Sequence, residues 1–519
     1  MSENVKRIPV AILISLMIAT GCSGTKSHNS PKFVVPEPPE EEFGDVFSLP
    51  DNIEYRPKID STSMLRNPCT GWAIYADGDL GVGQAAYWAA QSEAARKYAT
   101  HFYIRWTWND MEPTEGQYAW KVNPNYKQMV QGALDRGLKL AFRVYNSSND
   151  IDVKATPDYV RDAGAEGKIV NVGTSRPQLW TPYEDDPVFL EKLDKFVKAF
   201  ALEYDNPDIV DYVDGLNVGS YGESHGITLK NDTPANRTAL FDNVTTIYAN
   251  NFHKVILDFP LASAFGKEVE RTIGVEQKGY GCRRDGLGSG YFLWDQQQQA
   301  KQFYGSTPLF GEACWFGSGE ATTFPSFWQG SGEYYFASWR ESFEKTMEHA
   351  MNNNFNTLDL RNRADVVGWT KQAPDLVELF VKKGGYRIRP EVISAPTTAR
   401  ATHTIKIGHR WVNAGIGYLP NNNIRWNYKY KVALAILGAD NSVKQLILDS
   451  RAEPSKFLRD GPYDYVTSVK LDDLPAGTYR LGVAIIDSTK GNAPAILLAT
   501  KADKTATGWY VVSQIEITK

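Results

Sequence analysis

The sequence predicts a (β/α)8 barrel of the TIM type, followed by an all-β, immunoglobulin-like sandwich. Two observations support this prediction. From Asn67 to Arg387, short apolar runs alternate with longer amphipathic ones, which is typical of βα units around a parallel sheet. After Pro390, short alternating segments are separated by turn clusters such as Pro420–Asn423, as in a sandwich. We therefore divide the chain into a leader (1–22), a tether (23–50), a barrel (51–390) and a sandwich (391–519).

The leader is a targeting segment. Lys6 and Arg7 precede an apolar run, Ile8–Ile18, that is too short to span a bilayer. The run ends in Ala19–Cys22, which resembles a bacterial lipobox, so we expect lipidation of Cys22 and a membrane anchor. The alternative is an ordinary cleaved signal. We expect the protein in the cell envelope, on the periplasmic side or at the cell surface.

Eight predicted strands and seven predicted helices make up the barrel region. The strands are Gly71–Tyr75, Phe102–Trp106, Lys139–Val144, Val210–Val218, Lys254–Phe259, Gly279–Arg283, Pro308–Glu312 and Asn356–Leu360. The helices are Ala86–Tyr98, Asn125–Arg136, Pro187–Tyr204, Ala235–Asn250, Trp294–Tyr304, Tyr335–Asn352 and Pro374–Lys383. An open doubly wound sheet is the alternative, but it needs a glycine-rich first βα turn, which Gly71–Ala73 is not.

Composition limits the classes of molecule that we expect the protein to bind. A net charge of -5 gives no support for nucleic acid or for an anionic membrane surface as a partner. Fourteen Trp and twenty-seven Tyr are more than a core of this size needs, and flat amphipathic rings suit sugar faces. The cysteines after the leader, Cys69, Cys282 and Cys314, lack metal-ligand spacing, so we expect neither a metal nor another cofactor.

A resemblance gives the barrel a function. The stretch Arg105–Trp120, RWTWNDMEPTEGQYAW, resembles the second-strand signature of barrel glycosidases of clan A, the largest retaining clan, especially the family 42 β-galactosidase type. The segments Asn67–Trp72, Gly222–His225 and Arg283–Gly288 resemble an uncharacterised family of secreted bacterial proteins with a glycosidase-like barrel and an attached sandwich. The resemblance covers nearly the whole mature chain.

The resemblance implies two catalytic carboxyls. The clan places its general acid/base after strand four and its nucleophile at the end of strand seven, which implies Glu223 and Glu312 here. One carboxyl protonates the leaving oxygen, and the other stays ionised to meet the developing positive charge. In the clan the acid usually follows an asparagine, whereas Glu223 follows Gly222. Asp258 and Asp285 therefore remain rival carboxylates.

Further site residues come from the strand ends, where TIM barrels place their functional groups. We expect Arg105 to face the site, with an ion pair to Glu112 as the structural alternative. We expect tryptophan rings to stack on sugar rings. The candidates are Trp106, Trp108 and Trp315, with Trp72 and Trp294 in addition. The predicted substrate-binding residues are Arg105, Trp106, Trp108, Arg143, Asn146, Asn217, His225, Asp285 and Trp315.

The sequence thus predicts a glycoside hydrolase-type protein that acts on a poly- or oligosaccharide by a two-carboxylate retaining mechanism. The alternative is a non-catalytic glycan-binding lipoprotein on the same scaffold, because a fold does not guarantee chemistry. A structural or adhesion role would explain the sandwich but not the carboxylates and aromatic residues at the strand ends. We expect the sandwich to support the barrel.

Overall fold

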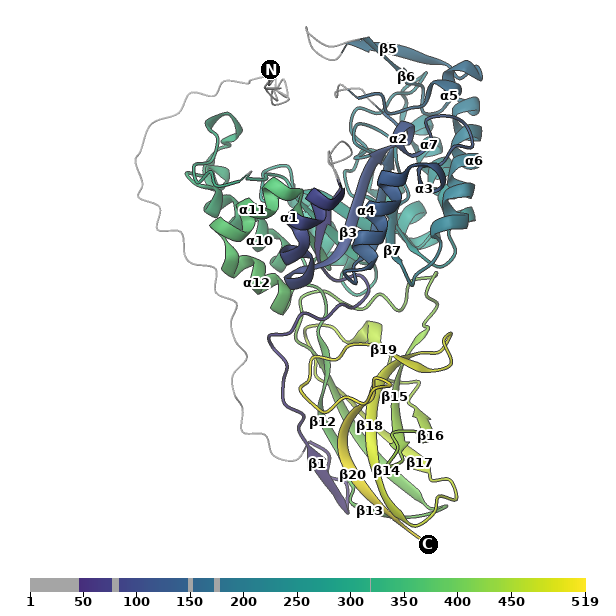
Figure 1. Cartoon of the computed structure of the whole chain (residues 1–519), viewed down its shortest axis with the longest axis vertical. Helices are drawn as coiled ribbons and strands as arrows, with labels where there is room; N and C mark the ends of the chain where they lie inside the picture. The colour runs from purple at the N-terminus through teal and green to yellow at the C-terminus, as the bar shows by residue number, and fades with distance from the viewer. Residues whose placement is uncertain (1–45, 77–83, 148–152, 172–177, 318) are drawn as a thin grey trace.

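The computed structural model describes residues 46–76, 84–147, 153–171, 178–317 and 319–519 (Figure 1). The predicted leader, Cys22 and most of the tether lie outside the described residues. Within the described part of the chain, no helix combines the length and apolar character needed to cross a membrane.

Eight parallel strands close into a barrel, so the predicted TIM fold is confirmed. Each predicted strand corresponds to one strand of the barrel, and most bounds differ by a few residues. Around the barrel the order is β10-β11-β2-β3-β4-β7-β8-β9. The strands are β2 (Gly71–Tyr75), β3 (Ala99–Thr107), β4 (Lys139–Tyr145), β7 (Val210–Asp214), β8 (Ile256–Pro260), β9 (Gly281–Leu287), β10 (Leu309–Ala313) and β11 (Thr357–Arg361).

Helices surround the barrel, and each of the seven predicted ones is present. Proline in the first turn begins α4, α6, α7 and α12, where a missing amide donor costs nothing. Helix α11 was not predicted from the sequence. The longer helices are α1 (Gln84–Lys97), α4 (Pro124–Leu134), α6 (Pro187–Tyr204), α7 (Pro234–Asn251), α9 (Trp294–Phe303), α10 (Trp339–Asn352), α11 (Arg363–Gln372) and α12 (Pro374–Lys383).

Shorter elements decorate the loops between strands and helices. They are α2 (Trp108–Met111), α3 (Ala119–Val122), α5 (Asp158–Asp162), the hairpin β5 (Gly167–Asn171) and β6 (Gln178–Pro182), α8 (Lys267–Val269), the π-helix η1 (Glu270–Gln277), and the 3-10 turns η2 (Ser326–Trp328), η3 (Gly332–Tyr334) and η4 (Pro454–Lys456). The hairpin β5–β6 projects from the end of the barrel away from the C-terminal domain (Figure 1).

The C-terminal domain has two sheets that share one hydrophobic core, as in a β-sandwich. One sheet has the order β1-β12-β14-β17, and the other runs β13-β20-β18-β15-β16 with β19 on β18. Side chains from both sheets, such as Ile407 and Val483, belong to the same buried cluster. The strands are β1 (Asn52–Tyr55), β12 (Ile388–Pro396), β13 (Thr398–Arg400), β14 (Thr404–Asn413), β15 (Tyr430–Leu437), β16 (Val443–Leu448), β17 (Tyr463–Lys470), β18 (Gly477–Asp487), β19 (Ala493–Ile496) and β20 (Tyr510–Thr518).

Strand β1 belongs to the sandwich although it precedes the barrel in sequence. It pairs antiparallel with β12, from Asn52 opposite Pro396 to Tyr55 opposite Ile393. Figure 1 shows β1, in purple, beside the sandwich strands. The expected division at 390–391 falls inside β12, and the range 51–390 includes β1. The barrel is therefore inserted between two strands of one sandwich sheet.

The sandwich closes one end of the barrel, the end where the barrel strands begin. Asn423 donates to Gly279 O (2.7 Å), and Arg425 donates to Lys278 O (3.0 Å) and Phe252 O (3.2 Å). The aromatic residues inside the barrel are part of the same buried cluster as the sandwich core. The opposite end, where the strands finish, is not covered by the sandwich, and we call it the mouth.

Candidate active site

Glu312 occupies the centre of the mouth, at the end of β10, and four arginines surround it. Its Oε1 accepts from Arg105 (3.0 Å) and Arg361 (2.7 Å), and its Oε2 accepts from Arg283 (2.6 Å). Arg143 Nη1 lies 3.9 Å from Oε2. Only 2% of the Glu312 side chain is exposed, so its charge is balanced by these cations rather than by water.

Glu223 faces Glu312 from the loop after β7. Its Oε1 accepts from Arg143 (3.0 Å) and from Arg105 (3.3 Å). Because Arg105 Nη1 also lies 3.0 Å from Glu312 Oε1, the two carboxylate oxygens are at most 6.3 Å apart, the sum of the two distances. Retaining glycosidases separate their carboxyls by about 5–5.5 Å and inverting ones by roughly 6.5–9.5 Å. The separation therefore favours the retaining geometry.

The backbone of this loop favours a glycine before Glu223. Gly222 has a φ of +71°, which favours glycine, and a Cβ there would lie 3.2 Å from Tyr145 Cβ and 3.3 Å from Arg143 Cδ. Tyr221 and Ser224 also have positive φ, although both carry side chains. The departure from the Asn-Glu pattern thus has a backbone cause, because this loop turns tightly over Arg143.

Glu184 fastens the same loop and was not found by sequence reasoning. Its Oε1 accepts from the amide of Gly219 (2.7 Å), and its Oε2 accepts from the amide of Thr228 (2.9 Å). Glu184 is fully buried, and burial raises its pKa to about 7 despite these two bonds. The carboxyl therefore ties both ends of the segment that carries Glu223 and His225.

Asp285 is a third carboxyl in the group. It lies on β9 and forms a side-chain hydrogen bond with Glu223. Burial and the neighbouring Glu223 charge raise the pKa of Asp285 to about 6. Burial alone would also raise the pKa of Glu223, but the hydrogen bond from His225 and the charge of Arg143 outweigh it and lower the pKa to about 2.

The exposure of these groups shows the direction from which a ligand would arrive. Side-chain exposure falls from His225 (50%) to Asp285 (24%), Glu223 (12%) and Glu312 (2%). Burial opposes ionisation of Glu312, but the charges of Arg283 and Arg105 hold its pKa well below the ordinary range. The cluster therefore combines an ionised inner carboxylate with an outer pair that holds a proton at mildly acidic pH.

Several predicted site residues meet here. Arg105, Arg143, His225 and Asp285 all contact Glu223, and Arg105 pairs with the two glutamates rather than with Glu112. Glu112 instead accepts from Trp108 Nε1 (3.0 Å) and the amide of Gly116 (2.8 Å). The motif Glu112–Gly116 (EPTEG) therefore stabilises a loop after β3 and does not supply a site carboxylate.

Three tryptophan predictions are wrong because the rings belong to the core. Trp106 alternates with Arg105 on β3, so its ring points outward and packs on Tyr126. Trp108 is fully buried among helix side chains, and Trp72 is fully buried and donates to Val377 O (2.9 Å). No sugar can reach these rings. Trp294 is 70% exposed at the start of α9, and Trp315 is half-buried just after β10.

Asn146 and Asn217 lie just beyond the ends of β4 and β7 and are fully buried. Among the described residues, neither amide group has a hydrogen-bond partner. Such groups need water or a ligand to satisfy them. The rival carboxylate Asp258 is also fully buried, and burial raises its pKa well above the ordinary value, so it is a poor candidate for contact with a substrate.

The described residues contain no group of three or more His, Cys, Asp or Glu side chains that could hold a metal ion. The groups that meet around Glu223 and Glu312 are carboxyls, guanidinium groups, the His225 imidazole and, through Arg283, the Tyr75 hydroxyl.

No protein-family model and no curated protein matches the chain. Solved structures do match it. A GH30 endoxylanase from Clostridium papyrosolvens C71 has 10% identity and a TM-score of 0.33, over 80% of this chain and 95% of that one. Endo-glycoceramidase II from a Rhodococcus species has 14% identity and a TM-score of 0.38, over 80% and 99%. A GH5_18 protein from Streptomyces cattleya has 11% identity and a TM-score of 0.39, over 65% and 84%. Because these scores are low, the functional argument rests on the site itself.

Proposed function

We propose that this protein is a glycoside hydrolase that cleaves a poly- or oligosaccharide with retention of configuration. The observation that supports it is the shared Arg105 Nη1, which brings Glu223 Oε1 and Glu312 Oε1 within 6.3 Å of each other at the mouth. Two carboxyls at this spacing are what a double displacement at a sugar carbon requires. The resemblance of the sequence to family 42 enzymes of clan A points to the same two residues.

Glu312 is the proposed nucleophile. The surrounding arginines keep it ionised, so its carboxylate can attack the anomeric carbon while the bond to the leaving oxygen breaks. The product of this step is a glycosyl ester on Glu312. The same arginines hold the carboxylate in one orientation and limit its freedom, which fixes the direction of attack.

The Glu223–Asp285 pair is the proposed acid/base. In the first step the pair gives its proton to the leaving oxygen, and the leaving group departs as an alcohol while the sugar stays bound to Glu312. In the second step the deprotonated pair takes a proton from water, whose oxygen attacks the anomeric carbon and releases Glu312. Asp285 is the more exposed member and has the higher pKa, about 6, so it carries the proton before the reaction begins.

Burial of Glu312 favours a second candidate, a glycan-binding protein without turnover. Both carboxylate oxygens are held by arginines, and the side chain is only 2% exposed, so a sugar must displace some of these contacts to reach it. In that case the arginines and Asp285 would bind hydroxyl groups without forming an ester.

Turnover and trapping distinguish the two candidates. The purified protein would be screened against aryl glycosides and polysaccharides, together with Glu312→Gln and Glu223→Gln. We expect hydrolysis by the wild type, loss in both variants, and a 2-deoxy-2-fluoro glycoside that remains attached to Glu312 by mass spectrometry. Glycan binding without hydrolysis, unchanged in both variants, would rule out the enzyme.

We also propose that the protein is anchored in the cell envelope through Cys22, which rests on the lipobox-like leader alone. The test is fractionation of cells that produce the wild type or Cys22→Ser. We expect the wild type in the membrane fraction and the variant in the soluble fraction. An unchanged distribution would contradict the anchor.

A further inference from the structure

A row of aromatic rings leads away from Glu312 along the loop that follows β10. We define the aromatic row as Tyr291, Trp315, Phe316, Phe327 and Trp328. The Trp315 and Trp328 rings are stacked, with centroids 5.4 Å apart and planes 20° apart. Phe327 lies 5.0 Å from Trp328, Phe316 lies 6.0 Å from Trp328, and Tyr291 lies 6.2 Å from Trp315. The five rings therefore form one connected cluster, in which only Trp315 and Trp328 have nearly parallel planes.

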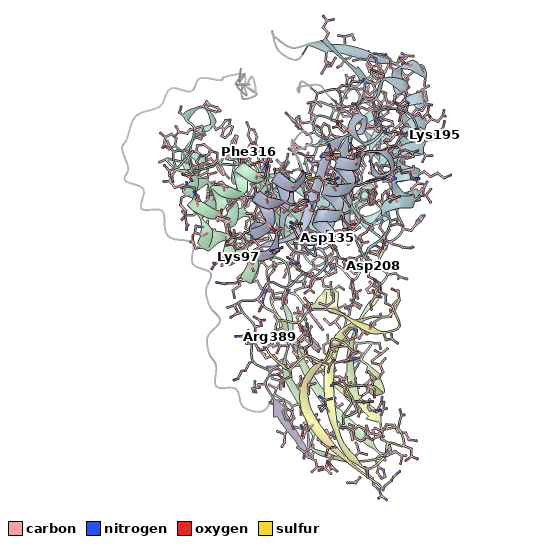
Figure 2. The ribbon with its side chains drawn as sticks, in the orientation of Figure 1. Lys97, Asp135, Lys195, Asp208, Phe316 and Arg389 are labelled. Carbon is pink, nitrogen blue, oxygen red and sulfur yellow. The ribbon has the colours of Figure 1, made fainter. Side chains whose placement is uncertain are left out.

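One arginine joins the row to the candidate site. The Arg361 guanidinium lies 4.0 Å from the centroid of the Phe316 ring, and its Nη1 donates to Glu312 Oε1 (2.7 Å). In Figure 2, Phe316 is labelled on the part of the barrel far from the sandwich, whereas Asp208 is labelled close to the sandwich. The row thus begins at the group that holds the proposed nucleophile.

The outer rings are more exposed than packing explains. Phe327 is 67% exposed and Tyr291 is 47% exposed, whereas Trp315 and Trp328 are half-buried and pack against the barrel core. A scattered apolar side chain on a surface is ordinary, but these two extend a continuous row. An aromatic ring carries negative charge on its face, and the C–H face of a sugar ring complements it.

We infer that the aromatic row is a binding surface for further sugar units of the same glycan, beyond the bond that is cleaved. This inference rests on the proposed function and deepens it, because it makes the substrate a chain rather than a single glycoside. From Trp315 through Trp328 to Phe327 the ring centroids are separated by 5.4 and 5.0 Å. The two exposed rings, Tyr291 beside Trp315 and Phe327 beside Trp328, offer separate contacts for neighbouring sugar units.

The charges around the row favour a glycan over a membrane. Anionic lipid attracts unpaired Lys and Arg, but two basic groups that contact the row are paired. Arg284, which donates to Tyr291 O, pairs with Asp285, and Arg361, which lies over Phe316, pairs with Glu312 (2.7 Å). A neutral sugar chain requires no excess charge.

The test compares polymer binding with the hydrolysis of a short substrate. The double variant Tyr291→Ala/Phe327→Ala removes the outer rings. Tyr428→Ala in the sandwich, where Tyr428 is 45% exposed, is the matched control for Tyr291. Affinity gels would contain xylan, galactan, mixed-linkage glucan or carboxymethyl cellulose, and binding would be measured in wild-type and Glu312→Gln backgrounds. Vesicles of phosphatidylcholine and phosphatidylglycerol serve as the lipid probe.

We expect at least one polymer to retard the protein, and each lost ring to weaken that binding about 3- to 10-fold. Tyr428→Ala should bind like the wild type. In the active protein, kcat/KM for the polymer should fall more than kcat/KM for an aryl glycoside. Equal losses on both substrates, polymer binding that the double variant retains, or no retardation in any gel would overturn the inference, as would vesicle binding that depends on the two rings.

Binding in the Glu312→Gln background separates this inference from the proposed function. Polymer binding that needs the row, without hydrolysis by the wild type, would refute the enzyme and leave the row as a glycan surface. If the double variant hydrolyses a polymer as fast as the wild type, the enzyme is supported and the aromatic row is refuted as a glycan surface.

Discussion

The two ends of the barrel both bury charged residues, but they satisfy them differently. At the closed end, Asp211 accepts from the amide of Cys69 and contacts His101 Nε2, and His101 Nδ1 is 2.7 Å from Thr100 Oγ1. At the mouth, Glu312 meets four arginines while Asn146 and Asn217 have no partner among the described residues. The Asp211 and His101 side chains are thus bonded to each other at the closed end, whereas two whole side-chain amides beside the carboxyls of the mouth have no partner in the described part of the chain. Unsatisfied amides next to buried charges are therefore the feature that the mouth adds.

The sharpest test of this contrast replaces one carboxylate at each end of the barrel with the corresponding amide. Glu312→Gln should reduce glycoside hydrolysis on the order of 10⁴-fold or more, since it removes the nucleophile. Asp211→Asn should leave the turnover of the folded protein close to wild type. Glu312→Gln breaks a buried ion pair and should lose about 3–5 kcal/mol of unfolding free energy, and Asp211→Asn weakens two buried hydrogen bonds and should lose about 1–3 kcal/mol. Steady-state kinetics and urea unfolding measure the two effects, and a large loss of turnover in Asp211→Asn would break the contrast.

The next effect concerns the proton at the mouth. Asp285 has a pKa raised to about 6, so it is protonated below that pH, and activity should fall as the pH rises through about 6. Asp285→Asn should slow substrates with alkyl leaving groups about 10²- to 10³-fold and remove this alkaline limb. Dinitrophenyl glycosides, which need no acid, should be affected far less in the first step. If Glu223→Gln shows this leaving-group dependence and Asp285→Asn does not, Glu223 carries the proton.

Two asparagines at opposite ends test the role of unsatisfied amides. Asn356 donates to Cys69 O (2.9 Å) and Tyr418 O (2.8 Å) at the closed end, so Asn356→Ala should cost about 2–3 kcal/mol of stability. Asn146→Ala loses no side-chain bond to a described residue and should cost less than about 1 kcal/mol, yet weaken glycan binding about 10-fold. Unfolding curves and titrations check both. An Asn146→Ala variant with unchanged affinity would show that the amide serves only buried water.

The smallest effect is the dependence of stability on pH, which should have opposite signs at the two ends. Burial and the charge of Glu312 raise the pKa of Asp359 to about 7, so its contribution to stability is present near pH 4 and lost as the pH rises through 7. Asp359→Asn cannot ionise and keeps an acceptor for the Ala313 amide (2.7 Å). We expect it to exceed the wild type by about 1.4 kcal/mol or more at pH 8, and to match it near pH 4.

Asp211 should behave in the reverse manner. Burial would raise its pKa, but the bond to His101 lowers it, so the ionised form stabilises the fold above about pH 4. Asp211→Asn should therefore lose stability at pH 8 and approach the wild type in acid. Urea unfolding of both variants at pH 4, 6 and 8 measures the crossing, and parallel pH curves would contradict the assigned charges.

The barrel could be predicted from the sequence because each strand is a short apolar run at the correct spacing. Strand β1 could not, since its four residues, Asn52–Tyr55, show no pattern and gain order only by pairing with β12. The resemblance to clan A implied Glu223 and Glu312, whereas Glu184 acts from a distant loop that no local pattern connects to Glu223. The wrong prediction for Trp106 could have been avoided, because neighbouring side chains on a strand point to opposite faces. If Arg105 points into the barrel, Trp106 must point outward.

The position of β1 has a consequence for how the molecule is oriented. The described chain enters the fold at the sandwich strand β1 (Figure 1), while Phe316 of the aromatic row lies at the opposite pole (Figure 2). A protein held by its N-terminus would be attached on the sandwich side, with the mouth at the pole farther from the attachment. Long polymers could then be gripped without first approaching the surface to which the molecule is fixed.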